Sequence, residues 1–488
     1  MILDMKIREY VVAFCAVLAM GCAGVCAAGA ENAMQCAVDR FSSDSTLRYA
    51  SVGICVMRID SATIVAGHAA EQSMITASTM KTVTSATALE VLGKDFTFGT
   101  QVYALGEIDR HGTLRGNLVV RGGGDPTLGS RYFADRSDFV DSVVAAVKHA
   151  GIRKINGRVE VDASLIPYPP VSPRWMVEDL SYDYGAGCFG LCFADNVLTV
   201  SFDRSGEEPT DFIVTPGIDG LAVNSRVALG DKGDIMPVDY VEALMDYDTP
   251  AINLWGGTYR SEQRFSDTFA NPVPHRLLLD SLCRALKAED VNVRGKNIDI
   301  DELRDVHLVA DYRSPQLPEV LKSLLYRSDN MFTEMVLRAV ALHDDGAATA
   351  ANGIAKVKAL WRSKGVPVDA LFMYDGSGLA RNGKASARFL CELLRSVQAD
   401  SDSIGVVFSS LLPLAGVSGT LKSLLAGTPL QGKIALKSGS MGDVQCFAGF
   451  YPAENPRYSV AILVNNYSCS RKTLRRNIEK LLLELFSE

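Results

Sequence analysis

One stretch of the sequence decides how the rest of the chain is interpreted, and it reads Ser78-Thr79-Met80-Lys81-Thr82-Val83-Thr84-Ser85-Ala86-Thr87-Ala88-Leu89-Glu90-Val91-Leu92-Gly93. The pattern predicts a helix over residues 78–92, because a glycine directly follows the last apolar residue, as at many helix ends. Three residues apart on that helix, Ser78 and Lys81 lie on the same face within side-chain reach. Taken alone, however, Ser-x-x-Lys is also compatible with an ordinary surface helix turn.

The spacing of Ser78 and Lys81 suits a serine nucleophile with a lysine base. A serine hydroxyl is a weak nucleophile until a neighbouring base removes its proton. Lysine can act as that base only when it is neutral, which requires burial or a second cation to lower its pKa. At the start of a helix, Ser78 would also have backbone N–H groups nearby.

Strand patterns flank this helix at both ends of the chain, at residues 51–60, 64–67, 433–438, 444–451 and 458–465. An amphipathic helix is predicted for residues 471–486, and the middle of the chain is helical at residues 317–340, 351–364 and 386–399. Whether the strands of the two ends share one sheet is left open by the sequence.

Residues 96 to about 300 have a different texture, with short alternating strands predicted at residues 101–105, 117–121, 157–161, 197–202 and 212–214. Gly and Pro separate these strands, as in the run from Gly122 to Pro126. We interpret that run as a turn, since no Lys-Ser/Thr follows as a phosphate-binding loop would require. The region is therefore expected to be a β-rich insert of one or two subdomains.

Two further short motifs follow in a fixed order. Ser328-Asp329-Asn330 stands between two predicted helices, where it could equally serve as a helix cap. Lys437-Ser438-Gly439 stands on a predicted strand, where the plain alternative is an exposed strand end. Each motif is weak alone, but a coincidence of all three in this order is improbable.

A helix-borne Ser-x-x-Lys, a loop-borne Ser-x-Asn and a strand-borne Lys-Ser/Thr-Gly together resemble the penicillin-recognising serine enzymes. About 250 residues separate Ser78 from Ser328, a gap that resembles the class C low-molecular-mass penicillin-binding proteins, which are D-alanyl-D-alanine carboxypeptidase/endopeptidases. Further segments fit that family, namely Arg121–Leu128, Trp175 with Asp179 and 184–186, 374–379, 412–416 and 419–421. Ser438 stands where threonine is commoner, and the 188–192 stretch is unusual.

The resemblance implies an α+β fold, in which a β-lactamase/transpeptidase-like domain carries a large β-rich insert. That domain has an antiparallel sheet flanked by helices plus a helical subdomain. We expect a signal peptide at residues 1–30, the first part of the transpeptidase-like domain at 31–100, the insert at 101–300 and the second part at 301–488.

The resemblance also implies roles for the motif residues. Ser78 is the acylated nucleophile, Lys81 its base, and Ser328 with Lys437 passes a proton to the leaving group. Substrate binding falls to Asn330, Ser438, Gly439 and Ser440. The expected partners are peptidoglycan stem peptides ending in D-Ala-D-Ala and β-lactam antibiotics.

The composition is that of an ordinary globular protein, with 48% hydrophobic and 22% charged residues among 488. Such a length exceeds one hydrophobic core, so two or three domains are expected. A net charge of −8 argues against nucleic acid as a partner, because nucleic-acid binders usually present a basic face.

The N-terminus predicts export to the periplasm or cell envelope. Lys6 and Arg8 precede a long apolar run that ends in Ala28-Gly29-Ala30, a small-x-small pattern typical of signal-peptidase sites. Two alternatives stay open, an uncleaved membrane anchor and a lipoprotein signal with Cys22 lipidated. Membrane attachment is expected only through one of these.

Metals and cofactors are not expected. None of the six histidines forms an i,i+4 ligand pair, and Gly-x-Ser-x-Gly is absent. Eight cysteines follow Ala30, of which Cys188 and Cys192 are the closest pair. Some could pair in an exported chain, a zinc site there lacks a matching His or Cys pair, and small buried residues are an equally good interpretation.

Two other functions remain open. A β-lactamase or esterase on the same scaffold would need fast deacylation by an activated water. A catalytically idle wall-binding or penicillin-sensing protein would not need to retain Ser78, Lys81, Ser328, Asn330 and Lys437 together.

Overall fold

The computed structural model describes residues 29, 31–206, 211–231, 239–298, 305–399 and 404–487. The signal peptide predicted for residues 1–30 therefore lies outside the described residues, except for Gly29. The chain divides into two compact units. The first consists of Met1–Thr79, Trp361–Phe372 and Lys384–Glu488, and the second of Met80–Leu360 and Met373–Gly383.

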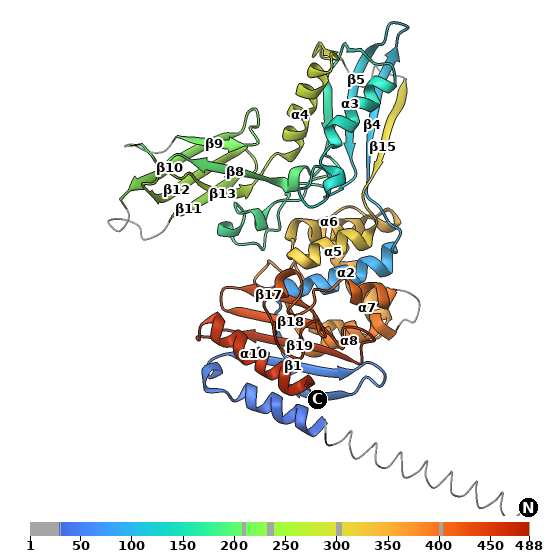
Figure 1. Ribbon diagram of the computed structural model, residues 1–488. Coiled ribbons are helices and arrows are strands. Elements are labelled where there is room, and N and C mark those ends of the chain that lie inside the picture. Colours follow the sequence, from blue (N-terminus) through green and yellow to red (C-terminus); the bar gives the residue numbers. More distant parts are fainter. Residues whose placement is uncertain are drawn as a thin grey trace, which may run out of the picture. The chain divides into compact units, whose positions relative to one another are not determined.

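The first unit is built on an antiparallel five-stranded sheet that joins the two ends of the chain (Figure 1). The order β17-β18-β19-β1-β2 uses the strands Ala435–Met441, Val444–Tyr451, Tyr458–Asn465, Ser51–Arg58 and Ile64–His68. Strand β1 pairs with β19 along its whole length, from Ser51 opposite Asn465 to Arg58 opposite Tyr458. The question that the sequence left open is thereby answered, since both ends share one sheet.

The central strands of this sheet are buried on both faces because helices cover it. In β1 and β19 almost every residue between the ends is buried. Helix α8 (Ala387–Ala399) packs on β1 and β19, while the buried stripe of α10 (Arg471–Phe486) joins the core formed by the sheet. The predicted apolar face of α10 is confirmed, with Leu474, Ile478, Leu481, Leu482 and Leu485 all buried.

Short elements complete the first unit. They are η1 (Ser45–Leu47), β3 (Ser73–Ile75) paired with β16 (Lys384–Ser386), η2 (Ala77–Thr79), η9 (Val368–Ala370), α9 (Ile404–Ser410) and η10 (Gly419–Leu421). Of these, η2 contains Ser78 and packs against β17 and β18.

The second unit contains a helical part and a β-rich part. In the helical part, α2 (Met80–Leu92) packs against α5 (Leu317–Arg327) and α6 (Asn330–Leu342), and α7 (Ala350–Ser363) follows. Helix α2 is buried on every side from Met80 to Leu89, so it has no polar face of its own. Its many threonines and alanines are small enough for neighbouring helices to approach closely.

The β-rich part holds three sheets (Figure 1). A six-stranded sheet combines β4 (Gly99–Ile108), β5 (Thr113–Gly122), β6 (Lys154–Ile155), β7 (Val159–Asp162), β14 (Asn292–Val293) and β15 (Val306–Arg313). Helices α3 (Phe139–His149) and α4 (Pro274–Ala288) share a hydrophobic core with it. The three-stranded sheets use β8 (Val197–Phe202), β9 (Phe212–Thr215) and β13 (Phe265–Ala270), and β10 (Ala222–Gly230), β11 (Tyr240–Asp246) and β12 (Ala251–Tyr259).

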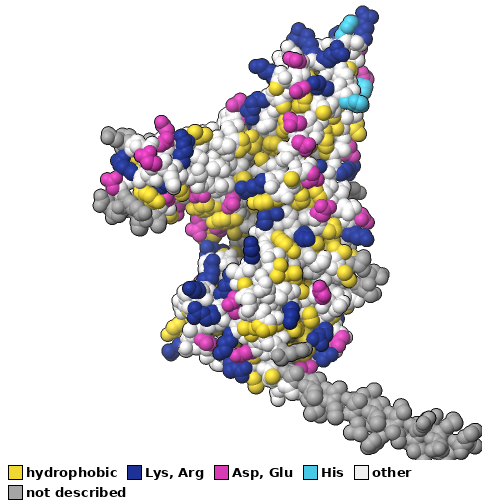
Figure 2. Space-filling model, in the orientation of Figure 1, with side chains coloured by type: hydrophobic (Ala, Val, Ile, Leu, Met, Phe, Trp, Pro, Cys, Tyr) yellow, Lys and Arg dark blue, Asp and Glu magenta, His cyan; other side chains and the backbone are white. Residues whose placement is uncertain are grey.

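The insert strands expected from the sequence all lie within these sheets, but β15 pairs with β4 beyond the expected limit of residue 300. The predicted domain boundaries at residues 30, 100 and 300 stay predictions. Figure 2 shows Lys and Arg side chains interspersed with Asp and Glu on the face that is drawn. In the described part of the chain, no helix combines the length and hydrophobicity needed to cross a bilayer.

Candidate active site

The predicted nucleophile lies in a tight turn rather than in the helix itself. Ser78 is the central residue of η2, and helix α2 begins two residues later at Met80. The turn is closed by Thr79, whose backbone N–H and hydroxyl donate to Thr76 O at 3.2 and 2.7 Å. Ala77 has a φ of 44°, in the left-handed region, so the backbone is strained directly before the serine.

Strand β17 runs so close to this turn that one of its residues must be glycine. A Cβ on Gly439 would come within 2.6 Å of Thr76 O and 2.9 Å of the backbone nitrogens of Ser78 and Thr79. These atoms all belong to the backbone and cannot move aside as a flexible side chain would. The Lys-Ser-Gly motif therefore lies beside the Ser78 turn, and Gly439 makes that approach possible.

The polar residues of β17 differ in exposure. Lys437 is fully buried, and its Nζ donates to Ser438 O at 2.6 Å. The Ser438 hydroxyl is 2.7 Å from the hydroxyl of Thr420 in η10, and Ser440 is exposed. The motif thus presents hydroxyl groups at the strand end, with a lysine beneath them. Thr420 was not predicted as a site residue, although the segment 419–421 was noted for its resemblance.

In the second unit, Lys81 is completely buried and donates hydrogen bonds to two acceptors. Its Nζ donates to Asn330 Oδ1 at 2.6 Å and to Ser377 O at 2.9 Å. Burial lowers the pKa of Lys81 to about 8, although the carboxylates of Asp375, Asp329 and Glu334 oppose this shift. A substantial neutral fraction near physiological pH is what a lysine base requires.

The second motif spans the junction between two helices. Ser328 ends α5 in the left-handed conformation with φ 63°, and Asp329 caps α6 by accepting the backbone N–H of Phe332 at 2.9 Å. The helix-capping interpretation is thus correct for Asp329. Asn330 is the first residue of α6. Its Nδ2 donates a hydrogen bond to Tyr184 O at 2.8 Å, and its Oδ1 accepts a hydrogen bond from Lys81 Nζ.

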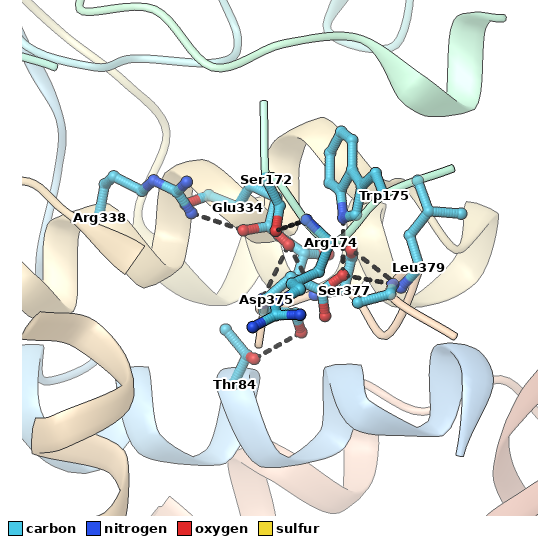
Figure 3. A network of polar contacts seen from close by, with 12 residues as sticks. Thr84, Ser172, Arg174, Trp175, Glu334, Arg338, Asp375, Ser377 and Leu379 are labelled. Carbon is cyan, nitrogen blue, oxygen red and sulfur yellow. Dashed lines mark hydrogen bonds and ion pairs between the residues drawn. The ribbon is translucent and has the colours of Figure 1, made fainter. Parts of the chain in front are cut away.

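Two buried carboxylates, Glu334 and Asp375, hold the loop that contains Ser377 (Figure 3). Glu334 accepts the backbone N–H groups of Gly376 and Ser377, both at 2.8 Å, and forms an ion pair of 2.5 Å with Arg338. Ser377 O in turn accepts Lys81. The loop whose Ser377 O accepts a hydrogen bond from Lys81 is therefore fixed by hydrogen bonds from its backbone to the Glu334 carboxylate.

Asp375 closes the same loop. It accepts the indole N–H of Trp175 at 2.8 Å and the backbone N–H groups of Gly378 and Ala380 at 2.8 and 2.7 Å. Burial and the nearby charge of Glu334 raise the pKa of Asp375 to about 6. The segment 374–379 and Trp175 had been noted from the resemblance, but nothing in the sequence singled out Glu334.

The structure thus assembles the predicted residues into two groups. The Ser78 turn adjoins the strand of Lys437, Ser438, Gly439 and Ser440 in the first unit, and Lys81 contacts Asn330 in the second. Lys81 follows Ser78 by three positions in the chain. The assignment of catalytic and binding roles to these residues stays a prediction.

Among the described residues, no group of three or more His, Cys, Asp or Glu is arranged to hold a metal ion. The eight cysteines after Ala30 are free thiols, and Cys188 and Cys192 are both buried. The interpretation of this pair as small buried residues fits that observation.

Comparison with solved structures identifies the fold. The crystal structure of penicillin binding protein 4 (dacB) from Haemophilus influenzae superposes with a TM-score of 0.79 at 24% identity, covering 91% of this chain and 98% of that one. The expected class is confirmed: a transpeptidase-like α+β fold with a large insert.

The sequence leads to the family. A D-alanyl-D-alanine carboxypeptidase from a species of Actinomadura is 27% identical over 447 residues, which are 88% of this chain and 80% of that protein. D-alanyl-D-alanine carboxypeptidase DacB of Haemophilus influenzae is 26% identical over 449 residues, 90% of this chain and 91% of that protein. The chain belongs to the D-Ala-D-Ala carboxypeptidase 3 (S13) family, whose sequence model matches residues 34–485. It is accordingly a serine peptidase, as the motifs predicted.

Proposed function

We propose that the protein is a D-Ala-D-Ala carboxypeptidase/endopeptidase that trims or cleaves peptidoglycan stem peptides through an acyl-enzyme at Ser78. The observation that carries this proposal is Lys81, a buried lysine whose pKa is lowered to about 8 and which follows Ser78 by three residues. A lysine in this state can accept a proton near neutral pH, whereas an exposed lysine cannot.

The reaction proceeds in two halves. Ser78 Oγ attacks the carbonyl between the two D-alanines as its proton passes to Lys81, and the C–N bond then breaks. Ser328 and Lys437 relay a proton to the nitrogen of the departing D-alanine. Water next attacks the ester, the C–O bond to Ser78 breaks, and the serine recovers its proton as the shortened peptide leaves.

The remaining motif residues bind the substrate. Asn330 donates to the amide of the acylated peptide, and Ser438 and Ser440 receive the terminal carboxylate together with Lys437. The backbone N–H groups of Ser78 and Ser440 stabilise the oxyanion, a contribution typically worth about 3 kcal/mol. The narrow gap that requires Gly439 supports this assignment, because it brings the backbone of β17 beside the Ser78 nitrogen.

Penicillin would acylate the same serine, because its strained amide is attacked in place of the peptide bond. The relatives named D-alanyl-D-alanine carboxypeptidase favour this substrate class. We place the protein in the periplasm or cell envelope, where peptidoglycan lies. N-terminal sequencing of the secreted form tests this placement, since cleavage after Ala30 leaves Glu31 as the first residue.

The proposal is tested by incubating the purified protein first with a fluorescent penicillin and then with a peptide ending in D-Ala-D-Ala. We expect a stable label and release of D-alanine, both lost in Ser78→Ala and both retained in Ser61→Ala, an exposed turn serine. Absence of Ser78-dependent labelling and D-alanine release contradicts the proposal. Rapid hydrolysis of a chromogenic cephalosporin would favour a β-lactamase instead.

A further inference from the structure

The second unit has a cavity of about 560 Å³, and none of the eight predicted site residues lines it. Its walls are mostly apolar and come from the segment 166–174, from the start of α7 and from Met373 and Tyr374. A volume of several hundred Å³ with apolar walls and few polar groups is typical of small-molecule sites. Two arginines, Arg174 and Arg338, supply the charge, and the described residues that line the cavity include no carboxylate.

Arg338 is the buried arginine of this cavity. Only 7% of its surface is exposed, and one of its guanidinium nitrogens forms the ion pair with Glu334. Its Nε is buried without a hydrogen-bond partner. A buried donor without an acceptor is rare in folded proteins, and Arg338 is one of the two charged residues that line the cavity.

Arg174 supplies a second cation from the exposed part of the lining, and its guanidinium lies 5.5 Å from the centre of the Tyr374 ring. The two arginines and the apolar walls together fit a molecule with an anionic head and an apolar body. A carboxylate suits an arginine best, because the planar guanidinium can donate to it in a bidentate fashion.

We propose that this cavity is a binding site for an amphipathic carboxylate, with its head group at Arg338 and Arg174 and its apolar body along α7. Such a ligand would also be linked to the active site, a consequence that rests on the proposed function. Arg338 forms an ion pair with Glu334, and Glu334 accepts the backbone N–H of Ser377 (Figure 3). The carbonyl oxygen of Ser377 accepts a hydrogen bond from Lys81 Nζ.

The direction of this link follows from charge. An added carboxylate near Arg338 introduces a negative charge on the side of Glu334, and negative charge favours the protonated form of Lys81. An occupied site is therefore expected to slow acylation of Ser78 and to move its pH profile toward higher pH. Because coupling is reciprocal, acylation should alter the affinity of the cavity as well.

Isothermal titration calorimetry with octanoate, and with octanamide as the uncharged analogue, tests the site directly. We expect saturable 1:1 binding of octanoate and much weaker binding of octanamide. Ala355→Phe fills the cavity from α7 and should weaken octanoate binding at least about tenfold. Arg174→Gln should weaken it about three- to fivefold, since the lost charge is exposed.

The matched controls are Ala359→Phe, one turn further along α7, and Arg362→Gln on the same helix, because both residues are exposed and neither lines the cavity. Both should bind octanoate as the unaltered protein does. The absence of saturable octanoate binding, equal binding of octanamide, or undiminished binding by Ala355→Phe would overturn the site. If octanoate binds but leaves the rate and pH profile of penicillin labelling unchanged, the link to Lys81 is wrong while the site stands. A protein that binds octanoate and is never labelled would instead contradict the proposed function.

Discussion

The two groups of candidate site residues differ in how deeply they are buried and in how fully their polar atoms are hydrogen-bonded within the protein. In the second unit, Lys81, Glu334 and Asp375 are at most 1% exposed and are held by short hydrogen bonds to the loop at residues 376–380 or to its backbone neighbours. In the first unit, the hydroxyls of Ser438 and Thr420 contact each other at the surface, and Ser440 is exposed. Lys437 is the buried exception in that group.

This difference matches the two tasks that the proposed function assigns to the two groups. A base has to be kept in a dry environment that lowers its pKa, which requires burial and fixed partners. A surface that receives a carboxylate has to keep its donors accessible until the ligand arrives. Changes to the buried group should therefore alter rate and stability strongly, whereas changes to the open group should alter mainly substrate affinity.

Lys81→Met gives the largest expected effect. Methionine keeps the apolar stem but removes the base, so the rate of Ser78 acylation should fall roughly a thousandfold. Fluorescent penicillin labelling over time measures this rate. Lys94→Met, at an exposed position just after α2, is the control and should label normally. Fast labelling of Lys81→Met would mean that another group is the base.

Glu334→Gln should destabilise the second unit by about 3 kcal/mol, because it leaves the buried Arg338 without its ion-pair partner. Chemical denaturation measures the change in the free energy of unfolding. Glu319→Gln, exposed in the first turn of α5, should change it by less than about 0.5 kcal/mol. Equal stability of the two variants would show that the buried pair contributes nothing.

The pH dependence of acylation sharpens the contrast further. Since the pKa of Lys81 is about 8 and its neutral form is the base, the second-order labelling rate should rise about tenfold between pH 7 and pH 9. The unfolding midpoint is followed over the same range to exclude loss of structure. A profile that is flat, or that rises only near the ordinary lysine pKa of 10.5, would contradict the buried-base interpretation.

Thr420→Val should have the smallest effect. It removes one exposed hydroxyl that contacts Ser438, so kcat/KM for a D-Ala-D-Ala peptide should fall about fivefold, mainly through KM. Thr63→Val, at an exposed turn of the first unit, should leave both constants unchanged. A loss in kcat alone would indicate that Thr420 acts on the chemistry rather than on binding.

Periodic patterns allowed much of the first unit to be predicted. The predicted bounds of β18, β19 and α10 agree with the structure, because each has an uninterrupted apolar pattern with clear ends. The predicted strand at residues 433–438 is displaced, since β17 begins at Ala435 and continues to Met441. The order of the three motifs, the gap of about 250 residues between Ser78 and Ser328 and several further segments together predicted the fold class and the family.

Other features depend on contacts between distant segments and could not be predicted. Glu334 is an ordinary glutamate in the sequence, and its role follows from meeting the 376–377 backbone. The depressed pKa of Lys81 was expected to need burial or a second cation, and burial is the cause found. Strands β10 to β13 and β15 were not predicted. In β10 and β13 the apolar residues alternate only weakly.

The pairing of β1 with β19 also governs when the enzyme can begin to work. Ser51 finds its partner only when Asn465 has been synthesised, after the whole insert has left the ribosome. Pairings between such distant residues form slowly, because the intervening chain must be ordered or looped out first. The strand that carries Lys437 joins that same sheet. A nascent or C-terminally truncated chain therefore has Ser78 and Lys81 but lacks the strand that we propose to receive the substrate, so we expect activity only after the last strands have formed.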